Sequence, residues 1–274
     1  MSRRHDRSAV TRPASSRRAG RRDFAELVRA AEPGADDLPL THITDAYRFR
    51  AVVEHGELAT SDCEVFGEPL LYLFYGRPAY RVTGSGTGTG LDAYWPICFV
   101  LRSDVAAKRI FPFDTGAFEK QLFADYCHKD MIREDFELEA DPATPQRLVR
   151  LFWEGARSYF ENRDFSEFAP EPFAFEAKSY NELIRSKANA AFDERHSAIE
   201  LQLDVPLPLK DNLIAVIMPA DFATPDILRH FDALGALVLP FDTVARHSAA
   251  NMVGQIYDIC RDLYAGNKGK VRYW

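Results

Sequence analysis

Residues 40–56 read LTHITDAYRFRAVVEHG, and this stretch sets the plan of the fold. Its first residues close a predicted β-strand at 38–43. Thr44 or Asp45 then provides a helix N-cap, apolar residues recur at helical spacing, and Gly56 provides a C-terminal stop. A strand that leads directly into an amphipathic helix is therefore expected to open the folded part of the chain.

Two further stretches add strands to this plan. The sequence LLYLFYGRP at 70–78 is dense in β-forming residues and bends at its Gly-Arg-Pro end. The sequence RHSAIELQ at 195–202 leads into a strand in which apolar and polar residues alternate, which is typical of a half-buried strand. Glu200 and Gln202 fall on the polar face of that strand. Glu200 is therefore expected to point away from the packed core.

The rest of the chain mixes helices with strands. We predict helices at 23–31, 118–126, 145–162, 180–191, 224–234 and 248–266, and strands at 80–83, 95–101, 213–218 and 236–239. The glycine-rich segment 84–90 resembles a phosphate loop, but no Lys-Ser/Thr pair follows it, so we interpret it as a flexible hairpin connection. The sequence has neither a regular βαβ repeat nor a glycine fingerprint. It therefore predicts an α+β fold built on split antiparallel β-sheets with peripheral helices.

The composition is that of a folded protein. With 274 residues, of which 46% are hydrophobic, the chain can fill a sizeable core. No apolar run reaches the roughly 18 residues that a membrane span needs, and no apolar signal-type stretch opens the chain. We therefore expect no membrane association and a cytoplasmic location. We also expect residues 23–274 to form one domain, with the last helices as a C-terminal elaboration.

The first 22 residues differ sharply from the remainder. They hold eight arginines and one acid, so the remainder carries a net charge of about −14 against −7 for the whole chain. The segment has almost no apolar side chains, and we expect it to be a disordered basic tail. Such a tail can bind nucleic acid through its phosphates. A solubilising tail, or one that docks on the acidic body, explains the composition equally well.

The cysteines suggest neither a disulfide framework nor a metal site. No CxxC pair occurs, and the only adjacent cysteine and histidine, Cys127 and His128, lack the spacing of zinc ligands. We expect reduced, mostly buried thiols and no bound metal. The four cysteines are Cys63, Cys98, Cys127 and Cys260.

The strand-to-helix junction carries the first candidate site residues. His42 can use its two ring nitrogens to bond the hydroxyl groups of a ribose, and Thr44 offers a second hydroxyl partner two residues later. The alternative is a histidine satisfied by the local backbone and a threonine that only caps the helix.

The aromatic strand carries the second group of candidates. Tyr72, Tyr75 and Tyr80 surround the bend and could stack on a base or nicotinamide ring. Arg77 is expected to point outward and bind phosphate oxygens, with Arg81 as a second candidate for that role. The alternative is a packed aromatic strand whose arginine makes a surface ion pair.

Glu200 is the candidate acid. A carboxylate at the head of a strand can face the electron-deficient carbon of a sugar while its glycosidic bond breaks, as in enzymes that stabilise oxocarbenium-like states. The alternative is an ordinary solvated carboxylate.

The order of these motifs resembles that of NAD-dependent ADP-ribosyltransferases, and within them the DarT-type DNA ADP-ribosyltransferase toxins. The resemblance consists of His-Ile-Thr before a helix that ends in Gly-Glu-Leu, a Tyr/Phe strand with Arg-Pro, and Arg-x-x-Ala-x-Glu on a strand. It covers approximately residues 40–218. It implies an ADP-ribosyltransferase-like fold, with NAD as the substrate and no metal.

The resemblance also implies roles for the candidate residues. His42 and Thr44 would bind the nicotinamide-side ribose, and the strand from Tyr72 to Arg77 would line the nicotinamide and phosphate pocket. Glu200 would be the catalytic glutamate, with Arg77 as the second catalytic residue. ADP-ribose would pass to a macromolecular acceptor, either nucleic acid or protein. A role as a toxin or defence effector, with an antidote or other partner protein, is a further expectation.

Two other functional classes remain open from the sequence. One is a catalytically silent sensor that binds a nucleotide in the same cleft. The other is a nuclease-like or nucleic-acid-binding protein that depends on the basic tail.

Overall fold

The computed structural model describes residues 23–80, 91–186, 194–243, 249–268 and 272–274. The strands of this part are β1 (Leu40–Asp45), β2 (Glu57–Leu58), β3 (Ser61–Cys63), β4 (Glu68–Tyr75), β5 (Pro96–Leu101), β6 (Arg109–Phe111), β7 (Glu200–Leu203), β8 (Leu207–Pro208), β9 (Leu213–Pro219) and β10 (Leu237–Phe241). Its α-helices are α1 (Phe24–Arg29), α2 (Ala46–His55), α3 (Thr115–Glu119), α4 (Thr144–Phe152), α5 (Ala156–Glu161), α6 (Phe175–Arg185), α8 (Pro225–Ala233) and α9 (Ala249–Tyr264). Short 3-10 helices lie at Asp92–Tyr94, Arg133–Asp135, Glu194–Ser197 and Ala220–Phe222.

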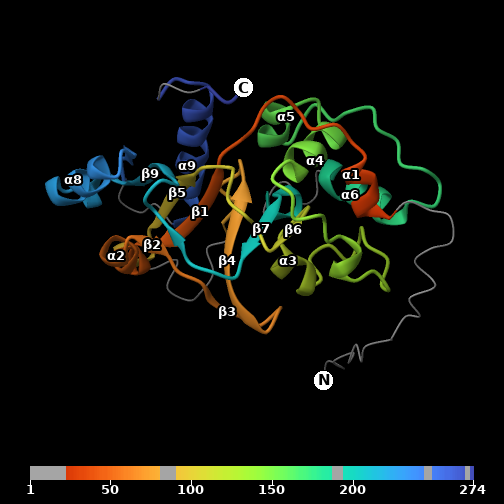
Figure 1. Ribbon diagram of the computed structural model, residues 1–274, viewed down its shortest axis with the longest axis horizontal. Helices are drawn as coiled ribbons and strands as arrows, with labels where there is room; N and C mark the ends of the chain where they lie inside the picture. Colours follow the sequence, from red (N-terminus) through yellow and green to blue (C-terminus); the bar gives the residue numbers. More distant parts are fainter. Residues whose placement is uncertain (1–22, 81–90, 187–193, 244–248, 269–271) are drawn as a thin grey trace.

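A central sheet organises the molecule, with strands in the order β10-β9-β5-β1-β4-β7-β6 (Figure 1). Strand β3 pairs with β4, and β2 pairs with β8 in a separate two-stranded sheet. All of these pairs are antiparallel except β9 and β10, which are parallel and joined through α8. The predicted α+β class with a mainly antiparallel sheet and peripheral helices is confirmed.

The helices form two groups around the sheet. Helices α1, α4, α5 and α6 gather beside β4, β6 and β7, whereas α2 and α8 lie toward the other end of the sheet (Figure 1). Helix α9 contacts β5 and β10. The buried apolar side chains form one continuous cluster that reaches from Phe24 in α1 to Tyr264 in α9. Each large side chain buried in such a cluster stabilises the fold by about 1.5–3 kcal/mol.

The strand-to-helix unit predicted from residues 40–56 is confirmed. Asp45 caps α2, since its side chain accepts a hydrogen bond from the Arg48 amide. Gly56 ends the helix with a left-handed φ of 71°, a conformation that costs glycine little. No helix in the described part of the chain is long and apolar enough to cross a membrane.

Three predicted elements differ from the structure. The helix expected at 145–162 is broken into α4 and α5, because Trp153 takes an extended conformation and bridges to Phe165. The helix expected at 118–126 is instead the short α3, which begins at its Asp114 N-cap. Helix α6 begins at Phe175 rather than at 180.

Some elements were not predicted, and some predictions fall on residues that the structure does not describe. Strand β6 was not predicted, because three residues are too few for a pattern. The basic tail 1–22, the hairpin 84–90 and residues 81–83 of the predicted strand 80–83 lie outside the described residues.

Candidate functional site

A cleft opens where the central sheet divides. Strands β1 and β4 pair only at Leu40 with Tyr75 and at Thr41 with Phe74. Beyond Thr41, β1 continues its pairing with β5 while β4 continues with β7. A cleft of about 690 Å³ lies at this division. Its walls are the end of β1, the outer face of α2, residues 57–61 and residues 70–72 of β4.

His42 spans the gap between the two strands. Its Nδ1 lies 2.9 Å from the carbonyl oxygen of Tyr72. Burial is the main cause that lowers the pKa of His42, and the Arg48 charge lowers it further, while the bond to Tyr72 acts in the opposite direction. The ring is therefore neutral at pH 7. A carbonyl oxygen only accepts, so Nδ1 carries the proton and Nε2 is left as an acceptor for a ligand hydroxyl.

Thr44 also lines the cleft and is 6% exposed. The cap of α2 is Asp45, so the threonine hydroxyl does not serve that purpose. The interpretation of Thr44 as only a helix cap is therefore wrong. His42, Thr44 and Tyr72, three of the predicted ligand-binding residues, are brought together on the walls of one cleft.

Arg48 and Arg50 are exposed cations on the wall of this cleft. The Arg48 side chain is 77% exposed and lies 3.5 Å from Asp45 in an ion pair. Arg50 also lines the cleft, and its guanidinium lies 4.5 Å from the centre of the Tyr47 ring. Sequence reasoning placed the phosphate-binding cation on Arg77 and Arg81 instead. The signal for Arg48 was its place in the first turn of the helix that follows β1.

Glu200 lies across β4 from this cleft. Phe74 pairs with Thr41 on one side and with Glu200 on the other, so these three residues point to the same face of the sheet. Two strand spacings place the Cα atoms of Thr41 and Glu200 about 10 Å apart. His42, the residue after Thr41 in β1, alternates to the opposite face of the sheet from Thr41 and Glu200, and Glu200 does not line the cleft.

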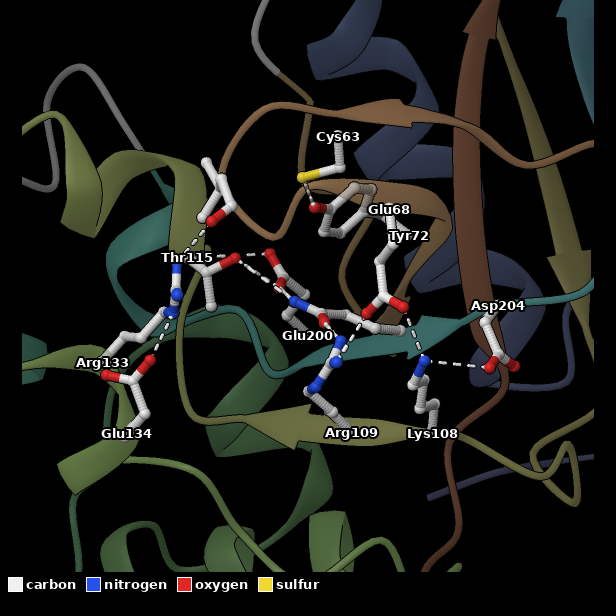
Figure 2. Close-up of polar contacts among 12 residues, drawn as sticks. Cys63, Glu68, Tyr72, Lys108, Arg109, Thr115, Arg133, Glu134, Glu200 and Asp204 are labelled. Atoms are coloured by element: carbon white, nitrogen blue, oxygen red, sulfur yellow. Dashed lines mark hydrogen bonds and ion pairs between the residues drawn. The ribbon is translucent and has the colours of Figure 1, made fainter.

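The Glu200 carboxylate is almost completely buried, at 1% exposure. The prediction that it points away from the packed core is wrong, because β6 extends the sheet beyond β7 and the start of α3 covers the polar face of β7. Oε2 accepts a hydrogen bond from the Thr115 amide at 3.0 Å. Oε1 accepts from Thr115 Oγ1 at 2.8 Å and from Gln202 Nε2 at 2.7 Å (Figure 2).

The protonation of Glu200 reflects this environment. Burial, and then the negative charge of Asp114, raise the pKa of Glu200 to about 8, while the hydrogen bonds from Gln202 and Thr115 oppose the increase. Asp114 caps α3 through the Ala117 amide, and its Oδ2 lies 3.5 Å from Arg195 Nη1. The site therefore holds two carboxyl groups in different surroundings, an arrangement that suits acid–base chemistry.

Tyr72 connects the cleft with the acid. Its phenol oxygen lies 2.7 Å from the Cys63 sulfur. Figure 2 shows the two side chains pointing toward each other. Burial and this hydrogen bond raise the pKa of Tyr72, and the charges of Glu200 and Asp114 raise it further. Tyr72 is therefore neutral, and it is close enough to both carboxyl groups to respond to their charge.

Arg77 does not point outward as predicted. It is completely buried, donates hydrogen bonds to Ser197 Oγ and the Tyr159 carbonyl, and lies 4.4 Å from the centre of the Tyr159 ring. Gly76 turns the chain inward with a φ of 67°, and a Cβ atom there would meet Leu38 Cδ1 at 2.5 Å. Arg77 thus joins the end of β4 to the turn before β7.

The remaining candidates fall into three classes. Tyr75 is buried at 1% exposure, and its hydroxyl accepts from the Leu38 amide and donates to Asp37, so it faces away from the cleft. Tyr80 is partly buried, and burial and the charge of Asp45 raise its pKa, which places it near the start of α2. Arg81 lies outside the described residues.

Sequence reasoning missed two residues that contact Glu200 directly. Gln202 shares its face because side chains of a strand repeat every two residues, and that signal was available. Thr115 had no such signal, since the contact joins positions that lie 85 residues apart.

The described residues contain no group of three or more His, Cys, Asp or Glu side chains that could hold a metal ion. No protein-family model matches the sequence, and no curated protein or solved structure is significantly similar to it.

Proposed function

We propose that the protein binds NAD in the cleft between β1 and β4 and acts as an ADP-ribosyltransferase-like enzyme. The observation that carries the proposal is the cleft that His42, Thr44 and Tyr72 line together. Tyr72 lies on β4, which pairs on its other side with β7, the strand of Glu200. In this proposal, three segments that are remote in sequence supply one site.

The cleft offers groups for each part of a dinucleotide. The Nε2 acceptor of His42 and the hydroxyl of Thr44 bind ribose hydroxyls. Arg48 binds the diphosphate, because an exposed guanidinium can donate two parallel hydrogen bonds to phosphate oxygens. The Tyr72 ring contacts the nicotinamide. The volume of about 690 Å³ is within the range of small-molecule sites.

Glu200 acts on the sugar in this scheme. The bond between C1′ and the nicotinamide nitrogen breaks, and its electron pair leaves with the nicotinamide. The carboxylate orients the ribose 2′-hydroxyl and stabilises the cation that remains. A nucleophile of the acceptor then forms the new bond to C1′ and releases a proton. Because Glu200 is 1% exposed, NAD must displace a covering side chain, and Tyr72 lies between cleft and acid.

The test compares the release of nicotinamide from labelled NAD by the wild type and by Glu200→Gln, in the presence of cell extract. We expect Glu200→Gln to lose at least a hundredfold in rate, which is a typical cost of removing a group that stabilises transition-state charge. Glu137→Gln, at an exposed glutamate, is the matched control and should retain the rate. Equal nicotinamide release by wild type and Glu200→Gln would exclude the proposed enzyme activity.

The acceptor is a macromolecule in this proposal, either nucleic acid or protein. The basic tail supports nucleic acid, because arginines neutralise phosphates, whereas the net charge of about −14 on the remaining residues supports a protein. Labelling an extract with radioactive NAD and treating it with nuclease or protease distinguishes them. Nuclease-sensitive label identifies nucleic acid, and protease-sensitive label identifies protein.

A second candidate function is nucleotide binding without turnover. The observation that favours it is that the Glu200 carboxylate is buried and already accepts three hydrogen bonds. Calorimetry separates the two functions: heat of NAD binding that is not followed by nicotinamide release supports a sensor.

A further inference from the structure

Glu200 is held by donors from two separate elements. Thr115, the first residue of α3, donates through both its amide and its hydroxyl, and Gln202 donates from the same strand as the acid. Thr115 and Gln202 also approach each other, with 3.4 Å between Gln202 Nε2 and Thr115 Oγ1. Neither side chain lines the cleft. Their contacts therefore act on the acid rather than on a ligand in the cleft.

The orientation of the Gln202 amide is fixed from the opposite side. Arg109 Nη1 lies 3.2 Å from Gln202 Oε1, and a guanidinium has only donors, so the amide oxygen faces Arg109 and the NH₂ group faces Glu200. Glu68 Oε1 accepts a hydrogen bond from Arg109 at 2.5 Å (Figure 2). The Arg109 guanidinium also lies 4.7 Å from the centre of the Phe66 ring. A chain of contacts thus runs from the sheet edge to the acid.

Other groups around Glu200 act in the opposite direction. The carboxyl group of Asp114 faces it from the loop before α3, and the phenol of Tyr72 faces it from β4. Arg195 pairs with Asp114 rather than with Glu200. Burial and Asp114 favour the neutral form of the acid, and its three hydrogen-bond donors oppose them.

We propose that Thr115 and Gln202 are positioning residues that favour the charged form of the Glu200 carboxyl group and fix its direction. The inference rests on the proposed function, because it concerns the acid of that reaction. Each carboxylate oxygen has two lone pairs, and among the described residues Oε1 accepts two hydrogen bonds whereas Oε2 accepts one. Oε2 is therefore the atom that remains for the ribose 2′-hydroxyl.

The experiment compares Thr115→Val, which keeps the shape of the side chain and removes its hydroxyl, with Thr115→Ser, which keeps the hydroxyl. The Glu200 carboxyl is titrated by carbon NMR on glutamate-labelled protein, with its signal identified by its loss in Glu200→Gln. The wild type should titrate near pH 8. Thr115→Val should titrate about one unit higher, because a hydrogen bond to a charged group is lost, and Thr115→Ser should match the wild type.

A second readout uses the reaction. The acidic limb of the kcat profile for nicotinamide release should move to higher pH in Thr115→Val by the same amount as the NMR titration, with KM for NAD unchanged. An unchanged Glu200 titration in folded Thr115→Val would overturn the role of Thr115. The same result in folded Gln202→Leu would overturn the role of Gln202. If Glu200 of the wild type titrates as expected but the protein releases no nicotinamide, the proposed function is wrong. The proposed effect of Thr115 and Gln202 on Glu200 ionisation would still hold.

Discussion

The cleft beside His42 and the buried surroundings of Glu200 lie on the two sides of β4 and differ in exposure and in hydrogen bonding. The cleft is open, and its polar groups include the exposed guanidinium of Arg48 and the free acceptor of His42. Glu200 is buried, and its carboxyl group accepts hydrogen bonds from Thr115 and Gln202. The comparison teaches that polar groups on the wall of a cleft can stay solvated. A buried carboxyl group, in contrast, needs fixed dipoles of the protein around it.

The largest expected effect is on stability, and it comes from comparing the buried Arg77 with the exposed Arg48. Arg77→Met should lower the free energy of unfolding by about 3 kcal/mol, because it removes a buried guanidinium that donates to the Ser197 hydroxyl and, beside the Asn162 amide, to the Tyr159 carbonyl. Arg48→Met, at an exposed site, should change it by less than about 0.5 kcal/mol. Urea unfolding measures both. Comparable losses in the two variants would contradict the distinction between a structural and a binding arginine.

The raised pKa of Glu200 predicts that the stability of the fold depends on pH. The pKa of Glu200 is about 8 in the folded protein against 4.5 as the ordinary value, so the folded state binds more protons between these pH values. Proton binding by Glu200 contributes fully to the free energy of unfolding below pH 4.5. This contribution is lost as pH rises to about 8, by up to about 1.4 kcal/mol per pH unit.

Glu200→Gln does not titrate, so it should gain stability relative to the wild type as pH rises. Urea unfolding of both proteins at pH 5, 7 and 9 measures this difference. A constant difference across the three pH values would show that the folded protein does not hold a proton on Glu200.

On the cleft side, His42→Phe should weaken NAD binding about tenfold, since it keeps a ring but removes the Nε2 acceptor and the bond to Tyr72. Calorimetry at pH 7.5 measures the affinity. His128→Phe, at an exposed histidine far from the cleft walls, is the control. If both variants bind NAD as the wild type does, the cleft is not the nucleotide site.

The smallest effect is expected at the neighbouring acid. Asp114→Asn retains a side-chain oxygen to cap α3 but removes a negative charge from beside Glu200. The pKa of Glu200 should fall by roughly half a unit. Carbon NMR titration detects the change, and a rise in the pKa would show that Asp114 acts through the local structure rather than through its charge.

The individual elements could be predicted because their signals are local. Asp45, Gly56 and the apolar spacing between them predict α2, and Thr224 predicts the start of α8. Errors occurred where tertiary contacts override such patterns. Trp153 breaks a continuous helical pattern because its extended backbone pairs with Phe165. The residues next to Trp153 in the sequence give no sign of this pairing.

The candidate site was predicted in part for a similar reason. His42, Thr44 and Tyr72 were identified because they lie at a junction and on a strand that their own sequence marks. Arg77 was misjudged, because the partners that bury it, Ser197 and Tyr159, come from distant segments.

Local sequence was therefore sufficient for the α+β class, the strand-to-helix junction and the identity of a candidate acid, since capping, glycine stops and side-chain alternation act over a few residues. The fold alone decided that β4 carries Phe74 between Thr41 and Glu200, that Arg48 rather than Arg77 faces the cleft, and that Thr115 reaches Glu200. These outcomes depend on strand order and register, which result from the packing of the whole core and which no short segment encodes.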